Sequence, residues 1–281
     1  MLFSKGFCVD ATSTQGIPFM TVVRLFAAVS VLGCATAHAE LNLWISYYAG
    51  GVDAHADARF EDAAVLMAEA QDETAKPHQR ALALDVLGKV HTALGRYEEA
   101  EAALHEALCL KESSVGPRSR TVPATLNALG DLHYIAGSPE KAEQHYRRAL
   151  DIHATDPNNV EVCRSLNGMA LLHAQRGEFV QAEELLTRAI RLHFKGDRST
   201  HPYRATAMIN LATLLTRLDR ADEAGQWLHD AAYIQTKQLR GDHPDVAVRL
   251  HAEANHLLAE GDSAGAYRVQ QRALSIRPDS L

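Results

Sequence analysis

The sequence predicts an all-α fold, a solenoid of stacked antiparallel helix pairs, on three observations. The composition is globular, with 47% hydrophobic and 22% charged residues, yet only 6% of residues are aromatic. Alanine dominates the apolar set, which favours closely packed helices over a β-sheet. A helix–turn–helix segment recurs every 40 to 42 residues. Because one such unit cannot bury its apolar face alone, neighbouring units must stack.

Three columns of small residues define the repeat. The first is always glycine or alanine, and the other two are alanine in all five units; small residues at fixed places let the two helices of a unit approach closely. The first column is Gly88, Gly130, Ala170, Ala212 and Ala254. The second is Ala100, Ala142, Ala182, Ala224 and Ala266, and the third is Ala107, Ala149, Ala189, Ala231 and Ala273.

Each unit also has a turn at one fixed place. An apolar stretch with helical spacing ends there, and a second amphipathic stretch follows with acidic residues such as Glu98 and Asp222 in its first turn. Acidic residues at a helix N-terminus complement the helix dipole. The predicted turn residues are Gly95, Gly137, Gly177, Asp219 and Gly261.

This pattern resembles the tetratricopeptide repeat family, whose signature has small residues at the places of these three columns. The period of about 42 residues, instead of the family's usual 34, is similar to the kinesin-light-chain-like subclass. Members of that subclass often have the sequence "HPDVA" at the start of the first helix of a unit, and here it is found at 243–247. The resemblance covers about 43–281 and implies a right-handed α-solenoid.

The repeat divides the chain into units. Residues 40–75 form a degenerate first unit, in which Gly51, Phe60, Ala63 and Ala70 keep the phase. Residues 76–281 contain five further units. These span about 77–114, 119–156, 159–196, 201–238 and 243–280.

Residues 1–39 read as an export segment. Arg24 precedes the apolar run 25–37, and the sequence Ala37-His38-Ala39 has the A-x-A form of a cleavage site. The run is shorter than the ~20 residues that span a bilayer. We therefore expect a signal peptide whose true start is Met20, and an extracytoplasmic protein, periplasmic or secreted.

Three alternatives to cleavage after Ala39 remain open at the N-terminus. The letters "VLGC" resemble a bacterial lipobox, so lipid attachment at Cys34 would give a membrane-anchored lipoprotein. The segment is otherwise an uncleaved anchor, or an extension upstream of the true start.

Composition and motifs argue against most other function classes. The net charge of −7 and the lack of a basic stripe give no reason to expect nucleic acid as a partner. A P-loop, a dinucleotide glycine fingerprint, H-E-x-x-H and paired C-x-x-C motifs are absent from the sequence. We therefore expect no cofactor, no metal and no enzymatic activity.

The stretch "GDSAG" at 261–265 matches the G-x-S-x-G pattern of α/β-hydrolases, which makes a serine hydrolase an alternative to consider. That site needs a preceding strand, yet 249–260 has helical phase, and no histidine follows Ser263. We instead expect a turn between paired helices, with Asp262 and Ser263 as caps of the second one.

Two groups of side chains have the residue types of metal ligands. Asp242, His243 and Asp245 surround Pro244, and we interpret them as a helix start. The second group occupies one equivalent place in three consecutive first helices, so we expect its imidazoles to stack along the array, an arrangement that can bind a transition metal or sense pH. No acid or thiol recurs beside this column, so a structural role is favoured. The column is His91, His133 and His173.

Family resemblance implies that the first helices line a concave groove. On each of them, places five, nine and twelve share one face. Repeated asparagines such as Asn127 and Asn167 can hydrogen-bond an extended peptide backbone, because an amide is both donor and acceptor. The candidate groove residues are Asp85, Lys89, Thr92, Asn127, Asp131, Tyr134, Asn167, Asn210, Thr213 and Asn255.

The sequence thus predicts an exported, non-catalytic protein-interaction module, a scaffold, adaptor or assembly factor that binds a peptide or protein segment. The alternative is a cytoplasmic peptide-sensing regulator with a wrongly assigned N-terminus. The chain carries no capping helix after its last unit, and an uncapped end exposes an apolar face. We therefore expect self-association or partner docking at that end.

Overall fold

The computed structural model describes residues 36–72, 76–153, 159–192 and 201–276, with side chains from Leu43 onwards. All regular structure within these ranges is helical, which confirms the all-α prediction. The expected start at Met20 and the lipid site at Cys34 lie outside the described residues. The expected cleavage after Ala39 falls in the first turn of a helix that begins at Thr36. No helix in the described ranges has the length and apolarity needed to cross a membrane.

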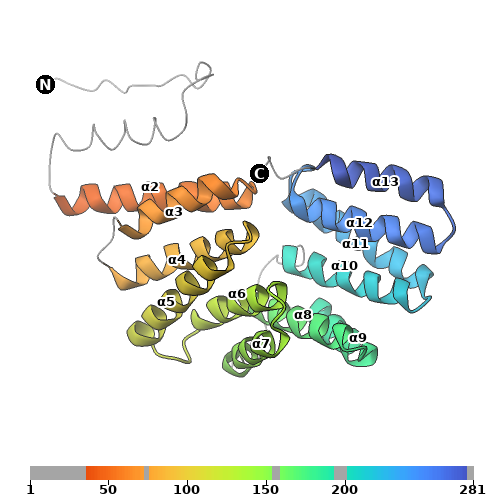
Figure 1. The fold of residues 1–281 in the computed structure, drawn as a ribbon, viewed down its shortest axis with the longest axis horizontal. Coiled ribbons are helices and arrows are strands. Elements are labelled where there is room, and N and C mark those ends of the chain that lie inside the picture. The colour runs from red at the N-terminus through yellow and green to blue at the C-terminus, as the bar shows by residue number, and fades with distance from the viewer. Residues whose placement is uncertain (1–35, 73–75, 154–158, 193–200, 277–281) are drawn as a thin grey trace, which may run out of the picture.

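The helices form six antiparallel pairs that stack in chain order along a curved array (Figure 1). The first three pairs are α2 (Thr36–Ala56) with α3 (Phe60–Asp72), α4 (Pro77–Ala93) with α5 (Tyr97–Val115), and α6 (Val122–Ile135) with α7 (Pro139–His153). The last three are α8 (Val160–Gln175) with α9 (Phe179–Arg191), α10 (Pro202–Arg217) with α11 (Ala221–Gln238), and α12 (Pro244–Ala259) with α13 (Ser263–Ser275).

The turn inside each pair has the conformation that its residue type suggests. Every predicted turn residue has a positive φ, from 58° at Asp219 to 87° at Gly261. Glycine adopts this left-handed region without a Cβ clash, and aspartate is one of the few other residues that tolerate it. The backbone is therefore left-handed at every predicted turn position.

The glycines of the first small column mark places with no room for a side chain. A Cβ on Gly88 would lie 2.4 Å from the Leu104 side chain, and one on Gly130 would lie 2.4 Å from the Tyr146 ring. The same ring lies against Gly168 of the next pair, where a Cβ would approach it to 2.3 Å. Tyr146 of α7 thus fills a gap between α6 and α8 that exists because both helices carry glycine there.

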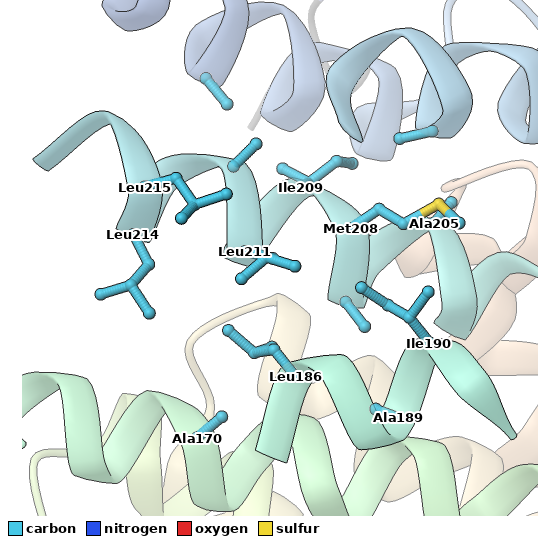
Figure 2. Close-up of a cluster of buried hydrophobic side chains, with 14 of the residues drawn as sticks. Ala170, Leu186, Ala189, Ile190, Ala205, Met208, Ile209, Leu211, Leu214 and Leu215 are labelled. Carbon is cyan, nitrogen blue, oxygen red and sulfur yellow. The ribbon is translucent and has the colours of Figure 1, made fainter. Parts of the chain in front are cut away.

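Apolar side chains fill the junctions between pairs. In the cluster of Figure 2, Leu186 and Ile190 of α9 lie against α10, near Leu211 and Met208. Each fully buried leucine or isoleucine stabilises the fold by about 1.5–3 kcal/mol relative to an exposed one. The second and third alanine columns are buried throughout, at 0–7% exposure, so they contribute close helix contact and little volume.

The contacts between pairs determine which helices face inward. Consecutive first helices touch each other all along the array, α2 with α4, α4 with α6, α6 with α8, α8 with α10, and α10 with α12. Within the described ranges, the backbones of consecutive second helices lie farther apart, and side chains such as Arg148 of α7 and Glu112 of α5 make the contacts between them. The first helices therefore line the concave side, and the second helices are splayed apart on the convex side.

The array curves until its two ends meet. Arg240, in the loop before α12, lies 3.9 Å from the carboxylate of Asp57, in the loop between α2 and α3. A cavity of about 360 Å³ lies between these two loops. The first and last pairs, which are far apart in the sequence, thus come together across the concave side (Figure 1).

The "GDSAG" stretch is a turn and a helix cap. Gly261 is the left-handed turn residue, and the Asp262 carboxylate accepts a 2.8 Å hydrogen bond from the Gly265 amide. Helix α12, not a strand, precedes it, and Ser263 is the first residue of α13. Asp262 is a cap as expected, but Ser263 is not one. Among the described residues, no histidine hydrogen-bonds to Ser263.

We predict that Gly168→Ala lowers the free energy of unfolding by about 1–3 kcal/mol, as overpacking does, because the new methyl group collides with the Tyr146 ring. Elsewhere in a helix the same change is stabilising by about 0.5–1 kcal/mol. Urea denaturation followed by circular dichroism measures the difference. Gly241→Ala, in the loop before α12 where a new Cβ meets nothing within 4 Å, is the control for an added methyl group without a collision. Equal stability of the two variants would contradict the packing of Tyr146 between glycines.

The same assay distinguishes the contributions of Asp262 and Ser263 to stability. Asp262→Ala loses the bond to the Gly265 amide, so we expect it to cost about 1 kcal/mol. Ser263→Ala should change stability by less than half as much, since Ser263 is exposed and caps nothing in the structure. A Ser263→Ala variant that loses an esterase activity of the wild type would instead support the hydrolase alternative.

Candidate functional site

All ten candidate groove residues lie on first helices, the helices of the concave side, but they differ in burial. Asp85 is 7% exposed and Asn127 is fully buried. The other eight keep some or most of their surface. These are Lys89 and Thr92 on α4, Asp131 and Tyr134 on α6, Asn167 on α8, Asn210 and Thr213 on α10, and Asn255 on α12.

Asp85 belongs to a buried ion pair. Its carboxylate contacts the Lys111 ammonium of α5 and accepts a 2.6 Å hydrogen bond from the Thr125 hydroxyl of α6. Lys111 also donates to Thr125 at 2.8 Å. Asp85 therefore joins three helices at the junction of two pairs. It is not free to meet a ligand in this structure.

Asn127 joins α6 to α8. Its Nδ2 group donates to the Glu161 carbonyl and to the Glu161 carboxylate, at 3.0 Å each. Its Oδ1 atom accepts a 2.6 Å bond from the Ser165 hydroxyl. This placement corrects the expectation that Asn127 offers its amide to a peptide, because both ends of the amide are bound inside the protein.

Asn167 and Asn210 are placed differently. The Asn210 Nδ2 group donates to the Asn167 Oδ1 atom at 2.9 Å, which joins α8 to α10 on a partly exposed surface. Within the described residues, the Nδ2 group of Asn167 and the Oδ1 atom of Asn210 make no hydrogen bond. The pair therefore keeps one donor and one acceptor for a ligand.

Asp131 fixes an arginine that the sequence analysis did not single out. Arg164 of α8 donates to Asp131 through Nε at 2.9 Å, and the Tyr146 hydroxyl donates to the same carboxylate at 2.7 Å. The Arg164 guanidinium lies over the Tyr203 ring, 5.6 Å from its centroid. Burial alone would lower the pKa of Arg164, but Asp131, Tyr203 and Glu161 together outweigh burial and keep that pKa well above its ordinary value.

Lys89 of α4 is a cation on the concave side of the array. It is partly buried and makes no ion pair with any described residue, since Asp85 is engaged by Lys111. Burial lowers the pKa of Lys89, and the charge of Arg164 lowers it further. Burial, followed by Lys89 and Arg164, lowers the pKa of His55 to about 4. This stretch of the concave side therefore carries positive charge that no neighbouring carboxylate neutralises in full.

The remaining candidate residues make few contacts with other helices. The Thr92 and Thr213 hydroxyls donate to carbonyls of their own helices, Gly88 at 2.8 Å and Ile209 at 2.9 Å. Tyr134 is half-buried and Asn255 is exposed. Arg164 and Tyr203 were missed because only places five, nine and twelve were read. Arg164 lies three residues before Asn167, so extending the same face by one turn would have included it.

The histidine column does not form a cluster. His133 is buried and stacks on His145 of α7 instead, with ring centroids 5.3 Å apart. His173 contacts Glu178. No group of ligand atoms among the described residues unites His91, His133 and His173. Equivalent positions of successive pairs are thus aligned in the sequence without being in contact.

The histidines before proline begin helices. The His243 Nδ1 atom accepts a 3.1 Å bond from the Asp245 amide, and Pro244 is the first residue of α12. His201 does the same for the Tyr203 amide at 3.2 Å, one pair earlier. The interpretation of "HPDV" as a helix start is confirmed.

Comparison with known proteins agrees with this architecture. The tetratricopeptide repeat model matches residues 79–155, 121–193 and 203–279, and a second tetratricopeptide repeat model matches residues 167–238. Protein KINESIN LIGHT CHAIN-RELATED 1 of Arabidopsis thaliana is 30% identical over 119 residues, which is 40% of this chain. The aligned part spans 19% of that relative's length.

Solved structures share the fold. BtubC (BKLC) from P. vanneervenii superposes with a TM-score of 0.57 at 20% identity, over 82% of this chain and 91% of that one. Rap Protein, solved in complex with Competence and Sporulation Factor, superposes with a TM-score of 0.71 at 13% identity, over 93% of this chain and 70% of that one. At such identities the likeness shows the fold alone. The family models match more than half of the residues, so the chain belongs to the tetratricopeptide repeat family, and its relatives include kinesin-light-chain-like members.

Proposed function

We propose that this chain is a non-catalytic protein-interaction module whose concave side binds an extended segment of a partner, with an acidic group of that segment at Lys89. Proteins of this family generally bind protein or peptide partners. Fold alone does not determine which partner is bound, so the chemistry of the concave side carries the proposal.

The decisive observation is that Lys89 is partly buried and makes no ion pair with a described residue, while the charge of Arg164 acts against its own. A desolvated charge is costly unless it is paired. A carboxylate placed against Lys89 would supply the missing partner in a charge-assisted hydrogen bond. The concave side therefore favours an acidic segment.

Main-chain recognition is available on the same side of the array. The donor of Asn167 and the acceptor of Asn210 remain for a peptide backbone, two junctions beyond α4. Such bonds hold an extended chain without selecting its side chains. In this proposal the asparagine pair provides affinity for any extended segment, and Lys89 provides the preference for acidic ones.

We expect peptides selected from a random displayed library on the purified chain to be enriched in Asp and Glu. Fluorescence anisotropy then gives the Kd of a selected peptide for the wild type and for Lys89→Gln. The substitution should weaken binding at least about tenfold, the usual loss for one hydrogen bond to a charged group. The salt dependence of Kd should also fall, because one charge no longer contributes.

The matched control is Lys237→Gln, which removes the same charge from an exposed position on α11, a second helix of the convex side. It should leave Kd within about twofold, as surface charges far from a contact do. Equal weakening by both substitutions, or none by Lys89→Gln, would contradict binding at Lys89.

The proposal also states where in the cell the protein acts. We infer that the module is exported and serves as a scaffold, adaptor or assembly factor outside the cytoplasm, because residues 1–39 have the pattern of a signal peptide. The competing function is a cytoplasmic peptide-sensing regulator. The observation that favours this regulator is the superposition with Rap Protein in its complex with Competence and Sporulation Factor.

Sequencing the N-terminus of the chain made in its native cell distinguishes the two. We expect a mature protein that begins at Glu40 in the extracytoplasmic fraction, or a lipidated Cys34 in the membrane fraction. An unprocessed N-terminus at Met1 or Met20 in the cytoplasmic fraction would favour the regulator. Binding at Lys89 is measured with purified protein, so it is tested separately from export.

A further inference from the structure

One group of side chains, between the second helix of one pair and the first helix of the next, has the arrangement of metal ligands. Among the described residues, Glu101 and His105 of α5 and His133 of α6 bring one ligand atom each to within 4.8 Å of the others. The Glu101 carboxylate oxygen lies 3.8 Å from the His105 Nε2 atom and 3.7 Å from the His133 Nε2 atom. A single carboxylate oxygen thus stands beside two imidazole nitrogens.

The fold creates this group at the junction between two helix pairs. Glu101 and His105 are four residues apart, so they share one face of α5. That face packs toward α6, where His133 is 4% exposed near the end of the helix. His145 of α7 stacks on His133 with an interplanar angle of 9°, and its ring centroid is 6.4 Å from that of His105. Three histidines and one glutamate therefore meet where α5, α6 and α7 converge.

The distances fit a small transition metal ion. Metal–nitrogen and metal–oxygen bonds of about 2.0–2.1 Å in a tetrahedral site place neighbouring ligand atoms about 3.4 Å apart. The two observed separations from the Glu101 oxygen exceed this by a few tenths of an ångström. Glu101 and His105 have side chains that are 41% and 52% exposed, so both can rotate to close the difference.

We propose that Glu101, His105 and His133 bind one divalent first-row transition metal ion, such as Zn²⁺. Two imidazoles and a carboxylate are ligands that zinc accepts when it keeps an open fourth position for water or another group. The bound ion ties the second helix of one pair to the first helix of the next. The site lies apart from Lys89 and is independent of the proposed peptide binding.

One neighbouring charge opposes the ion. The Lys141 ammonium of α7 lies 3.7 Å from the same Glu101 oxygen, and it is 61% exposed. A cation at this distance competes for the carboxylate and repels a divalent ion. Its flexible, exposed side chain can move into solvent when the ion binds. Removal of this charge should therefore preserve or tighten metal binding, whereas removal of a ligand should weaken it.

The test uses the full chain without a polyhistidine tag, stripped of metal with a chelator and titrated with Zn²⁺ in a calorimeter. We expect one saturable site with a micromolar Kd and a rise in Tm on zinc addition. Titration with Co²⁺ should give the visible absorption bands of a four- or five-coordinate site. Glu101→Gln and His105→Gln should each raise Kd at least about tenfold. Both positions are solvent-accessible, so these variants should fold, which an unchanged Tm without metal verifies.

Two controls make the result specific. His229→Gln removes an exposed histidine of α11, outside the group, and should bind zinc like the wild type. Lys141→Gln should bind at least as tightly as the wild type. The proposal is overturned if zinc shows no saturable micromolar binding. It is also overturned if Glu101→Gln and His105→Gln bind as tightly as the wild type, or if Lys141→Gln binds more weakly.

Discussion

Close helix contact at positions without room for a Cβ is the constraint on which this array depends. Tyr146 shows how far it reaches. Its ring occupies the space left by Gly130 in its own pair and by Gly168 in the next pair. Its hydroxyl group donates to Asp131, which in turn binds Arg164. The same side chain therefore sets the spacing of three helices and the position of a charged group on the concave side. A larger residue at either glycine would move both the core and the candidate site.

The fold could be predicted because the information is repeated. Five units carry the same small columns and the same turn, so each unit supports the alignment of the others, and a single exception such as Asp219 does not obscure it. The candidate site could be predicted only as far as its helices. Spacing along one helix defines a face, but whether Asn127 is open or covered depends on Glu161 and Ser165 of the next pair. That contact joins residues 34 and 38 positions apart, which helical periodicity does not describe.

The pairing of charged residues shows the same limit of prediction from helical spacing. In the sequence Asp85 and Lys89 are four residues apart, the spacing of a helical ion pair. In the structure Asp85 is bonded to Lys111, 26 residues away, and Lys89 is left without a partner among the described residues. The histidines behave alike. Alignment groups His133 with its equivalents in other units, whereas packing places it beside His105 and His145 from second helices. Clusters of charged and polar side chains in this array thus arise from contacts between non-equivalent positions.

The contact between the two ends of the array has a mechanical consequence. Arg240 and Asp57 are both well exposed, and an exposed ion pair contributes at most about 1 kcal/mol, less as salt increases. Each pair otherwise contacts only its near neighbours along the chain, so small rotations at successive junctions add up. Their sum changes the separation between the loop that holds Asp57 and the loop that holds Arg240. A slight bend shared among all junctions therefore suffices to separate this weak ion pair and to open the mouth of the concave side.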